Sequence, residues 1–224
     1  MKTGKIDDGL NMVLAESISK ENFDCAYYAD LVLKDADARR DILALTFGHP
    51  HIMVYYHGYY ILDKAAEENP GLFYEYWSDF AGLLAHKNTY HRQIGITLIA
   101  RLSKADTENR FTKIRNAYLK RLYDEKMLIG VLTARYLRTI LQNKPEYLDS
   151  VVTELMKHRD KTPYTEKQEA LFECDVLDIF DDHYEAVRKN KKIDEYILAR
   201  MNSASPKTKK KSRQLVKKYG IPVK

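Results

Sequence analysis

Apolar residues recur every three or four positions along this chain, in segments separated by short polar turns. The pattern is clearest in three successive segments, Thr89–Lys104, Glu108–Tyr123 and Met127–Asn143. This spacing gives each segment one apolar stripe if the segment is helical. Three striped helices joined by turns of about four residues are typical of antiparallel helices that pack side by side. The pattern predicts an all-helical fold, and we find no convincing strand.

The rest of the chain follows the same pattern, and several helix boundaries carry their own signals. We expect Pro70 and Pro145 each to open a helix, because the N–H that proline lacks would have no partner in the first turn of a helix. Thr165 and Gln168 have the spacing of a capping box. We expect Ser205 to cap the last helix and Gly220 to end it. Arg159–Tyr164 is expected to be a polar loop. The other expected helices are Leu10–Ile18, Asn22–Lys34, Asp37–Phe47, Pro50–Glu67, Gly71–Ala85 after Pro70, Glu146–His158 after Pro145, Thr165 through Phe180, Ile193–Met201 and Pro206–Tyr219.

The ends of alternate helices recur at a nearly constant interval. Helices ending near Ala66, Lys104, Asn143, Asp182 and Tyr219 are spaced by 38, 39, 39 and 37 residues. A helix pair that recurs at this interval indicates an α-solenoid, because one pair alone cannot bury its apolar stripe. We therefore expect a single domain over residues 1–224, a right-handed α-solenoid of about five antiparallel helix pairs. We expect it to be monomeric or weakly associating.

Short stretches within this period resemble HEAT repeats. His86–Arg92, followed by Ile94, Leu98 and Ala100-Arg101-Leu102, resembles the polar turn, the arginine and the second helix of such a repeat. Glu125–Leu141 and Lys167–Phe180 resemble poorer copies. The resemblance covers residues 36 to 220 and implies a HEAT-like, or armadillo-like, fold.

Charge is distributed unevenly along the chain. The net charge is +5, but Arg188–Lys224 holds thirteen Lys and Arg against two acids. A basic end on an acidic body suggests an anionic partner. The alternative interpretation is a solvated lysine-rich helix, residues 205–220, that covers the end of an apolar array. The sequence favours neither.

Composition indicates a cytoplasmic protein. Cys25 and Cys174 lie far apart and form no disulfide framework. Met1–Asp8 lacks the apolar core of a signal peptide, and no run approaches the roughly 18 apolar residues of a membrane span.

No motif for catalysis or for cofactor binding stands out. We find no Ser/His/Asp set, Gly-rich phosphate loop or metal-ligand spacing, so we expect no catalytic residue, metal or cofactor. His49, His51 and His57 lack a paired i, i+4 arrangement, which favours capping and packing roles. A dense aromatic cluster is either a stacking surface for a base or a proline-rich peptide, or, as we favour, part of the core: Tyr55, Tyr56, Tyr59, Tyr60, Phe73, Tyr74, Tyr76 and Trp77.

Four arginines lie on successive second helices, which line the inner face of a HEAT-like array: Arg92, Arg101, Arg135 and Arg138. Guanidinium groups there could grip phosphates or a partner's carboxylates. The alternative is pairing with acids in the turns, namely Glu108, Asp124 or Glu125. The basic end adds further candidate binding residues: Lys207, Lys209, Lys210, Lys211 and Arg213.

Three stretches resemble the HEAT-like DNA alkylation-repair glycosylases: Asn88–Arg92, Tyr136-Leu137-Arg138 with Asn143-Lys144-Pro145, and Ser205–Gly220. The resemblance implies a cleft carboxylate and tryptophans that assist the loss of a damaged base. Here Tyr55–Gly58 occupies the region of the carboxylate, Arg135 occupies the tryptophan position, and the only tryptophan, Trp77, lies elsewhere. Only Arg92 matches a functional position of that family.

The sequence therefore favours a non-enzymatic binding scaffold that presents its second helices to a protein or peptide partner. The alternative is a nucleic-acid-binding protein related to those glycosylases but without their carboxylate. Such binding would be weak and sequence-tolerant, and it would be lost near physiological salt.

Overall fold

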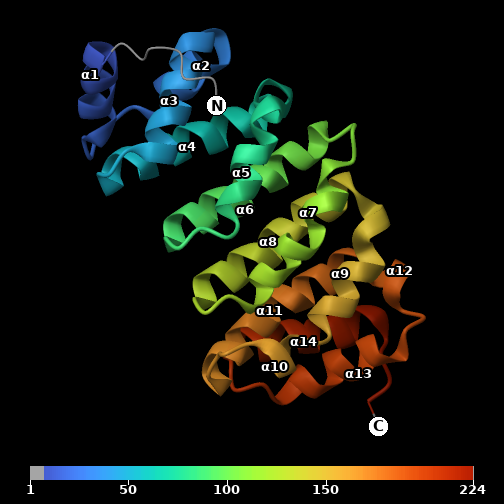
Figure 1. Cartoon of the computed structure of the whole chain (residues 1–224). Helices are drawn as coiled ribbons and strands as arrows, with labels where there is room; N and C mark the ends of the chain where they lie inside the picture. Colours follow the sequence, from blue (N-terminus) through green and yellow to red (C-terminus); the bar gives the residue numbers. More distant parts are fainter. Residues whose placement is uncertain (1–7, 224) are drawn as a thin grey trace. The chain divides into compact units, whose positions relative to one another are not determined.

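The computed structural model describes residues 8–223, and every regular element in that range is a helix (Figure 1). The all-helical class is thereby confirmed. The first seven residues and Lys224 lie outside the described range. The stretch Met1–Asp8, in which no signal-peptide core was found, therefore lies almost entirely outside it. No helix in residues 8–223 is long and apolar enough to cross a membrane. The chain divides into two compact units, Met1–Asn109 and Arg110–Lys224, here called unit 1 and unit 2.

Short 3-10 helices, labelled η, lie between some of the α-helices. Unit 1 contains α1 (Asp8–Ser19), α2 (Cys25–Lys34), α3 (Ala36–Gly48), α4 (Ile52–Glu68), η1 (Pro70–Tyr76), α5 (Trp77–Leu83), α6 (Thr89–Leu102) and η2 (Ser103–Ala105). Unit 2 contains α7 (Arg110–Leu119), η3 (Lys120–Tyr123), α8 (Met127–Asn143), η4 (Pro145–Tyr147), α9 (Leu148–Leu155), α10 (His158–Lys161), α11 (Glu166–Asp182), α12 (Tyr184–Val187), α13 (Lys191–Ala199), η5 (Arg200–Asn202) and α14 (Pro206–Tyr219).

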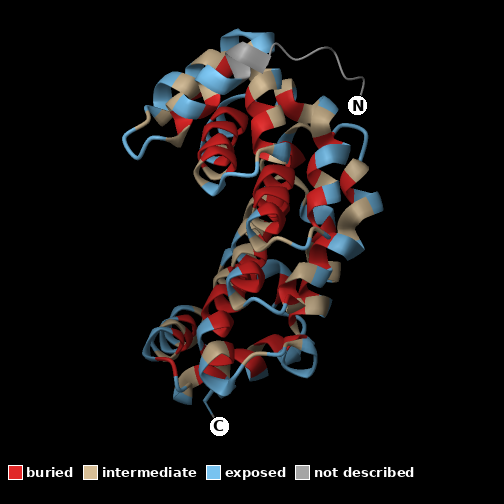
Figure 2. Cartoon of the chain, turned by 60° about the vertical axis from the view of Figure 1, so that its left-hand side comes forward, coloured by how far each residue is buried: buried red, intermediate tan, exposed pale blue. Residues whose placement is uncertain are grey.

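Each unit is built around a row of three helices that lie side by side. The row helices are α2, α4 and α6 in unit 1, and α8, α11 and α14 in unit 2 (Figure 1). In unit 1, α3 packs against α4 and α5 packs against α6; in unit 2, α13 packs against α14. Buried positions lie where helices face one another, and exposed positions lie on the outer sides (Figure 2).

The apolar stripe read from the sequence is buried in α6, and the other sides of that helix are largely buried as well, because Ile96, Thr97 and Ala100 are also fully buried. Ile94, Leu98, Ile99 and Leu102 are fully buried there. Burial of each such side chain contributes about 1.5–3 kcal/mol. Another residue, Gly95, lets α6 approach α5 closely, because a Cβ at that position would lie 2.9 Å from the carbonyl oxygen of Phe80.

Several hydrogen bonds join residues that are 38 positions apart. Tyr59 on α4 and Thr97 on α6 share one at 3.2 Å, and the Tyr219 hydroxyl donates to the carbonyl oxygen of Asp181 at 3.0 Å. The interval that separates helix ends in the sequence therefore also separates partners on neighbouring row helices.

The predicted helix boundaries on α11 and α14 are confirmed. Thr165 and Gln168 form a complete capping box at the start of α11. The Ser205 side chain accepts the N–H of Thr208, and Gly220 ends α14 with a φ of 63°, a left-handed conformation that glycine adopts without strain.

Three local expectations are wrong. The stretch expected as a loop, Arg159–Tyr164, overlaps helix α10, which has four residues and is too short to show a period. The short helix α12 was not expected for the same reason. The helices after Pro70 and Pro145 begin as 3-10 turns and become α-helical only at Trp77 and Leu148. Such turns are common at helix N-termini.

Candidate binding surfaces

Three tyrosines from two neighbouring row helices form an exposed aromatic group in unit 1, here called the tyrosine patch. They are Tyr56 and Tyr60 on α4 and Tyr90 on α6. The ring centroids of Tyr56 and Tyr60 are 4.8 Å apart, and those of Tyr56 and Tyr90 are 5.2 Å apart, both in edge-to-face contact. The exposed fractions of Tyr60 and Tyr90 are 41% and 38%. The patch therefore presents exposed aromatic surface on two helices that pack against each other.

Helical spacing explains why some aromatic residues reach the surface and others do not. Tyr56 and Tyr60 are one turn apart on α4, whereas Tyr55 and Tyr59 point to the buried side. The sequence-based preference for a core role holds for Tyr55, Tyr59, Phe73 and Trp77, which are buried. In the sequence, Pro50–Glu67 is apolar on nearly every side, which is typical of a helix buried between neighbours, but α4 exposes one edge of that surface.

The hydroxyl of Tyr60 stays protonated at neutral pH. Partial burial of the phenol, followed by its hydrogen bond with Tyr56, raises the pKa of Tyr60 to about 12. A neutral phenol presents an apolar ring with one polar end, which suits an interface that is apolar at its centre and wet at its edge.

A charged group continues the same stripe of α4. Asp63 and Glu67 follow Tyr60 by one and two helical turns, and Arg101 on α6 donates to both. The Arg101 Nε–Asp63 and Nη1–Glu67 distances are both 2.7 Å. Lys64, which is exposed one position after Asp63, adds a second cation, so the two carboxylates are balanced by Arg101 and Lys64.

The structure places the predicted arginines in hydrogen bonds and ion pairs within the chain. Arg92 is buried, and it donates to the carbonyl oxygens of His86 and Lys87 in the turn before α6. In unit 2, Arg135 lies 2.8 Å from Asp175, and Arg138 makes a two-point contact with Asp182. For Arg101, Arg135 and Arg138, the carboxylates identified here lie on neighbouring row helices and not in the turns.

The basic residues of α14 fall into two groups. Lys211 lies 2.6 Å from Asp178 and 2.9 Å from Asp181 on α11, and Lys218 lies 2.6 Å from Asp181. Among the described side chains, those of residues 12–223, no ion pair involves the others, which are Lys207, Lys209, Lys210, Arg213 and Lys217. Three of these, Lys210, Arg213 and Lys217, are exposed on the outer side of the helix, and Lys209, which is half-buried, flanks them; these four residues are here called the basic stripe.

Comparisons with known proteins do not place the chain in a family. No protein-family model matches it, and no curated protein or solved structure shows significant similarity to it. The exposed surfaces of the two units and their chemistry are therefore the basis for inferring a function.

Unit 2 also contains a hydrogen-bonded polar cluster, formed by His158, Arg159, Glu169, Glu173, Tyr196 and Arg200. His158 bonds Glu169 through Nδ1 and Tyr196 through Nε2, both at 2.8 Å. Glu173, which is fully buried, lies 2.6 Å from Arg159 and 2.7 Å from Arg200. This cluster could not be predicted from the sequence, because its members come from α10, α11, α13 and η5 and share no motif.

Part of that cluster is the only His/Cys/Asp/Glu group in the described chain that brings potential metal ligands together. His158, Glu169 and Glu173 offer ligand atoms within 4.8 Å of one another. Glu169 contacts Nδ1, whereas Glu173 lies nearer Nε2, at 4.0 Å. The two carboxylates therefore approach different nitrogens of the ring. The arginines already balance the charge of Glu173, so the arrangement fits an internal network better than a metal site.

The histidines singled out in the sequence have local partners. His57 stacks on Phe23 with 4.1 Å between ring centroids, and its Nδ1 lies 2.6 Å from the carbonyl oxygen of Ile18. His49 Nδ1 accepts the backbone N–H of His51 at the start of α4. These contacts agree with packing and capping roles.

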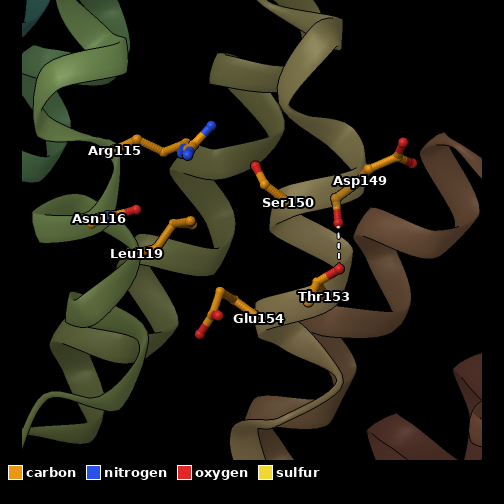
Figure 3. A pocket seen from close by; sticks show the side chains of 7 residues that line it. All are labelled: Arg115, Asn116, Leu119, Asp149, Ser150, Thr153 and Glu154. Atoms are coloured by element: carbon orange, nitrogen blue, oxygen red, sulfur yellow. Dashed lines mark hydrogen bonds between the residues drawn. The ribbon is translucent and has the colours of Figure 1, made fainter.

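A groove of about 310 Å³ lies between α7 and α9 (Figure 3). Its lining residues are Arg115, Asn116, Leu119, Asp149, Ser150, Thr153 and Glu154. Both hydroxyls donate back to their own segment, Ser150 to the carbonyl of Tyr147 and Thr153 to that of Asp149. Glu154 binds Lys157 and Lys161. With its hydroxyls directed into the backbone and no histidine in its lining, the groove offers no activated nucleophile.

Proposed function

We propose that this protein is a non-enzymatic binding scaffold that holds a peptide segment of a protein partner on the tyrosine patch. The observation that carries the proposal is the exposure of Tyr60 and Tyr90 beside Tyr56 on two packed helices. Tyrosine is enriched among the residues that dominate interface energies, because its rigid ring buries a large area at low entropic cost.

The surroundings of the tyrosine patch support this proposal. Tyr59 and Thr97 join α4 to α6 beneath the patch, so the rings are held by buried contacts. A site held in its bound arrangement loses less conformational entropy when a partner binds.

We further propose that the two units belong to one right-handed HEAT-like solenoid of about five helix pairs, and that the protein acts in the cytoplasm. Support for the solenoid comes from the rows of helices and the interval of 38 residues between hydrogen-bonded partners. Small-angle scattering tests it, because a solenoid gives an elongated particle, whereas a compact sphere would contradict the arrangement.

The ion pairs of Arg101, Arg135 and Arg138 bear on the nucleic-acid alternative. Each guanidinium has a carboxylate within 2.8 Å, which cancels much of its attraction for phosphate. These positions therefore support the scaffold interpretation more than a phosphate-binding face.

Selection from a random-peptide library on the full-length protein tests the function. We expect enriched peptides whose affinity falls at least about 10-fold for Tyr60→Ala/Tyr90→Ala, a loss of roughly 1.4 kcal/mol. Tyr27→Ala is the matched control, because Tyr27 is 58% exposed on α2 and makes no ring contact with the three patch residues. Equal affinity of the patch variant and the wild type would contradict the proposal.

A further inference from the structure

The basic stripe lies opposite the residues that fix α14 to the rest of unit 2. Thr208, Ser212 and Leu215 are buried, and at 100° per residue they share one side of the helix. Lys210 and Lys217 project from the opposite side, with Arg213 between them and Lys209 next to it. Three of the four cations of the stripe therefore face away from the packed core, and Lys209 lies half-buried at its flank.

A second observation separates the stripe from the structural lysines of the same helix. Lys211 and Lys218 turn toward α11, where Asp178 and Asp181 bind them. The carboxylates of α11 neutralise that edge of α14 and leave the stripe uncompensated within the described chain. The positive charge that the sequence assigns to the whole terminal helix is thus concentrated on one side.

The composition of the stripe favours phosphate over protein carboxylate as its ligand. It holds three lysines and one arginine and no aromatic or large aliphatic side chain. The centres of protein interfaces are depleted in lysine and enriched in aromatic residues, whereas lysine and arginine supply many contacts to nucleic-acid phosphates. We infer that the basic stripe binds the phosphate backbone of duplex nucleic acid without reading its sequence.

The dimensions of the stripe set the expected strength of binding. From Lys209 to Lys217 it extends about 12 Å along the helix axis. A duplex carries one charge per roughly 1.7 Å, so it presents about seven charges over that length. Four cations can each meet a phosphate, which predicts a salt slope of about 3 to 4. Binding is expected to weaken about 100-fold between roughly 50 and 200 mM salt.

Fluorescence anisotropy with a short labelled duplex of random sequence tests the inference on the full chain. The stripe variant is Lys210→Gln/Arg213→Gln/Lys217→Gln. We expect its salt slope to fall to about 1, so that affinity changes only about 4-fold over the same salt range. The control is Lys20→Gln/Lys64→Gln/Lys87→Gln, which removes the same formal charge from exposed lysines of unit 1. Circular dichroism verifies that both variants are folded.

The control variant should bind the duplex as the wild type does. Three results would overturn the inference: a wild-type slope below about 1, an equal loss of binding in the control variant, or tighter binding of a glutamate-rich peptide of equal charge than of the duplex. The first would leave α14 as a solvated end helix, and the last would assign the stripe to an acidic protein segment. A negative result in this experiment would not contradict the proposed role of the tyrosine patch, because the two sites share no residue.

Discussion

Arg101 on α6 donates to Asp63 on α4 across 2.7 Å, although 38 positions separate the two residues along the chain. The pair joins two row helices at the surface of unit 1, and both side chains are about four-fifths buried. Two charged residues that are distant in the sequence therefore pair where α4 packs against α6.

Replacing Arg101 with Gln is expected to destabilise unit 1 by roughly 1–2 kcal/mol, between the values for exposed and fully buried ion pairs. Asp63 would then lose its partner while remaining largely desolvated. The control is Arg40→Gln, whose pair with Asp37 is exposed and should contribute less than about 0.5 kcal/mol. Urea unfolding of the two variants provides the comparison, and equal midpoints would contradict the assignment.

Gly95→Ala is expected to destabilise unit 1 by about 1–3 kcal/mol, even though alanine favours helices. The new methyl group would lie 2.9 Å from the Phe80 carbonyl oxygen and 3.0 Å from the Leu83 Cβ, so α5 and α6 must separate. Gly82→Ala on α5 is the matched control, because nothing lies within 4 Å of its added Cβ. Thermal unfolding should show a lower midpoint for the first variant only.

Arg200→Gln is expected to destabilise unit 2 by roughly 3 kcal/mol, because Glu173 would remain buried with less compensating charge. Adding Glu173→Gln should recover part of that loss by removing the charge. A double-mutant cycle in urea measures the coupling. A double variant whose loss equals the sum of the two single losses would show that the residues are independent.

Acid should weaken unit 2 through Glu154. Hydrogen bonds from Lys161, with smaller effects from Lys157 and Tyr123, lower the pKa of Glu154 from 4.5 to about 2. A folded-state pKa below the unfolded value stabilises the protein above about pH 4.5, and this contribution is lost as pH falls toward 2. Glu154→Gln should therefore lose less stability than the wild type between those values. Glu195→Gln, which removes an exposed carboxylate from α13, should follow the wild-type profile.

Periodicity in the sequence was sufficient to predict the long helices but not their exposed edges. α8 and α14 have the expected bounds, because α8 carries a full apolar stripe and α14 has clear signals at both ends, Ser205 and Gly220. The partners of Arg135 and Asp181 could not be predicted, since they depend on which face of a neighbouring helix lies opposite. The surface position of Tyr60 was missed for the same reason, because a helix rich in tyrosine looks apolar on every side until its neighbours are known.

Short elements and polar clusters were beyond the reach of periodicity. α10 spans only His158–Lys161, about one helical turn, and His158 meets Tyr196 only because α10 and α13 are brought together by packing. The candidate residues of α14 were identified from charge alone. Their division into paired and unpaired lysines required the position of Asp181.

Site-specific photo-cross-linking in cells that naturally express the protein tests the central claim most directly. The photoreactive residue p-benzoylphenylalanine would replace Tyr60 or Tyr90, with Tyr27 as the control position. A partner held on the tyrosine patch predicts the same protein adduct from positions 60 and 90, and none from position 27. Absence of an adduct at 60 and 90, or the same adducts from position 27, would contradict the claim that this patch is the binding surface.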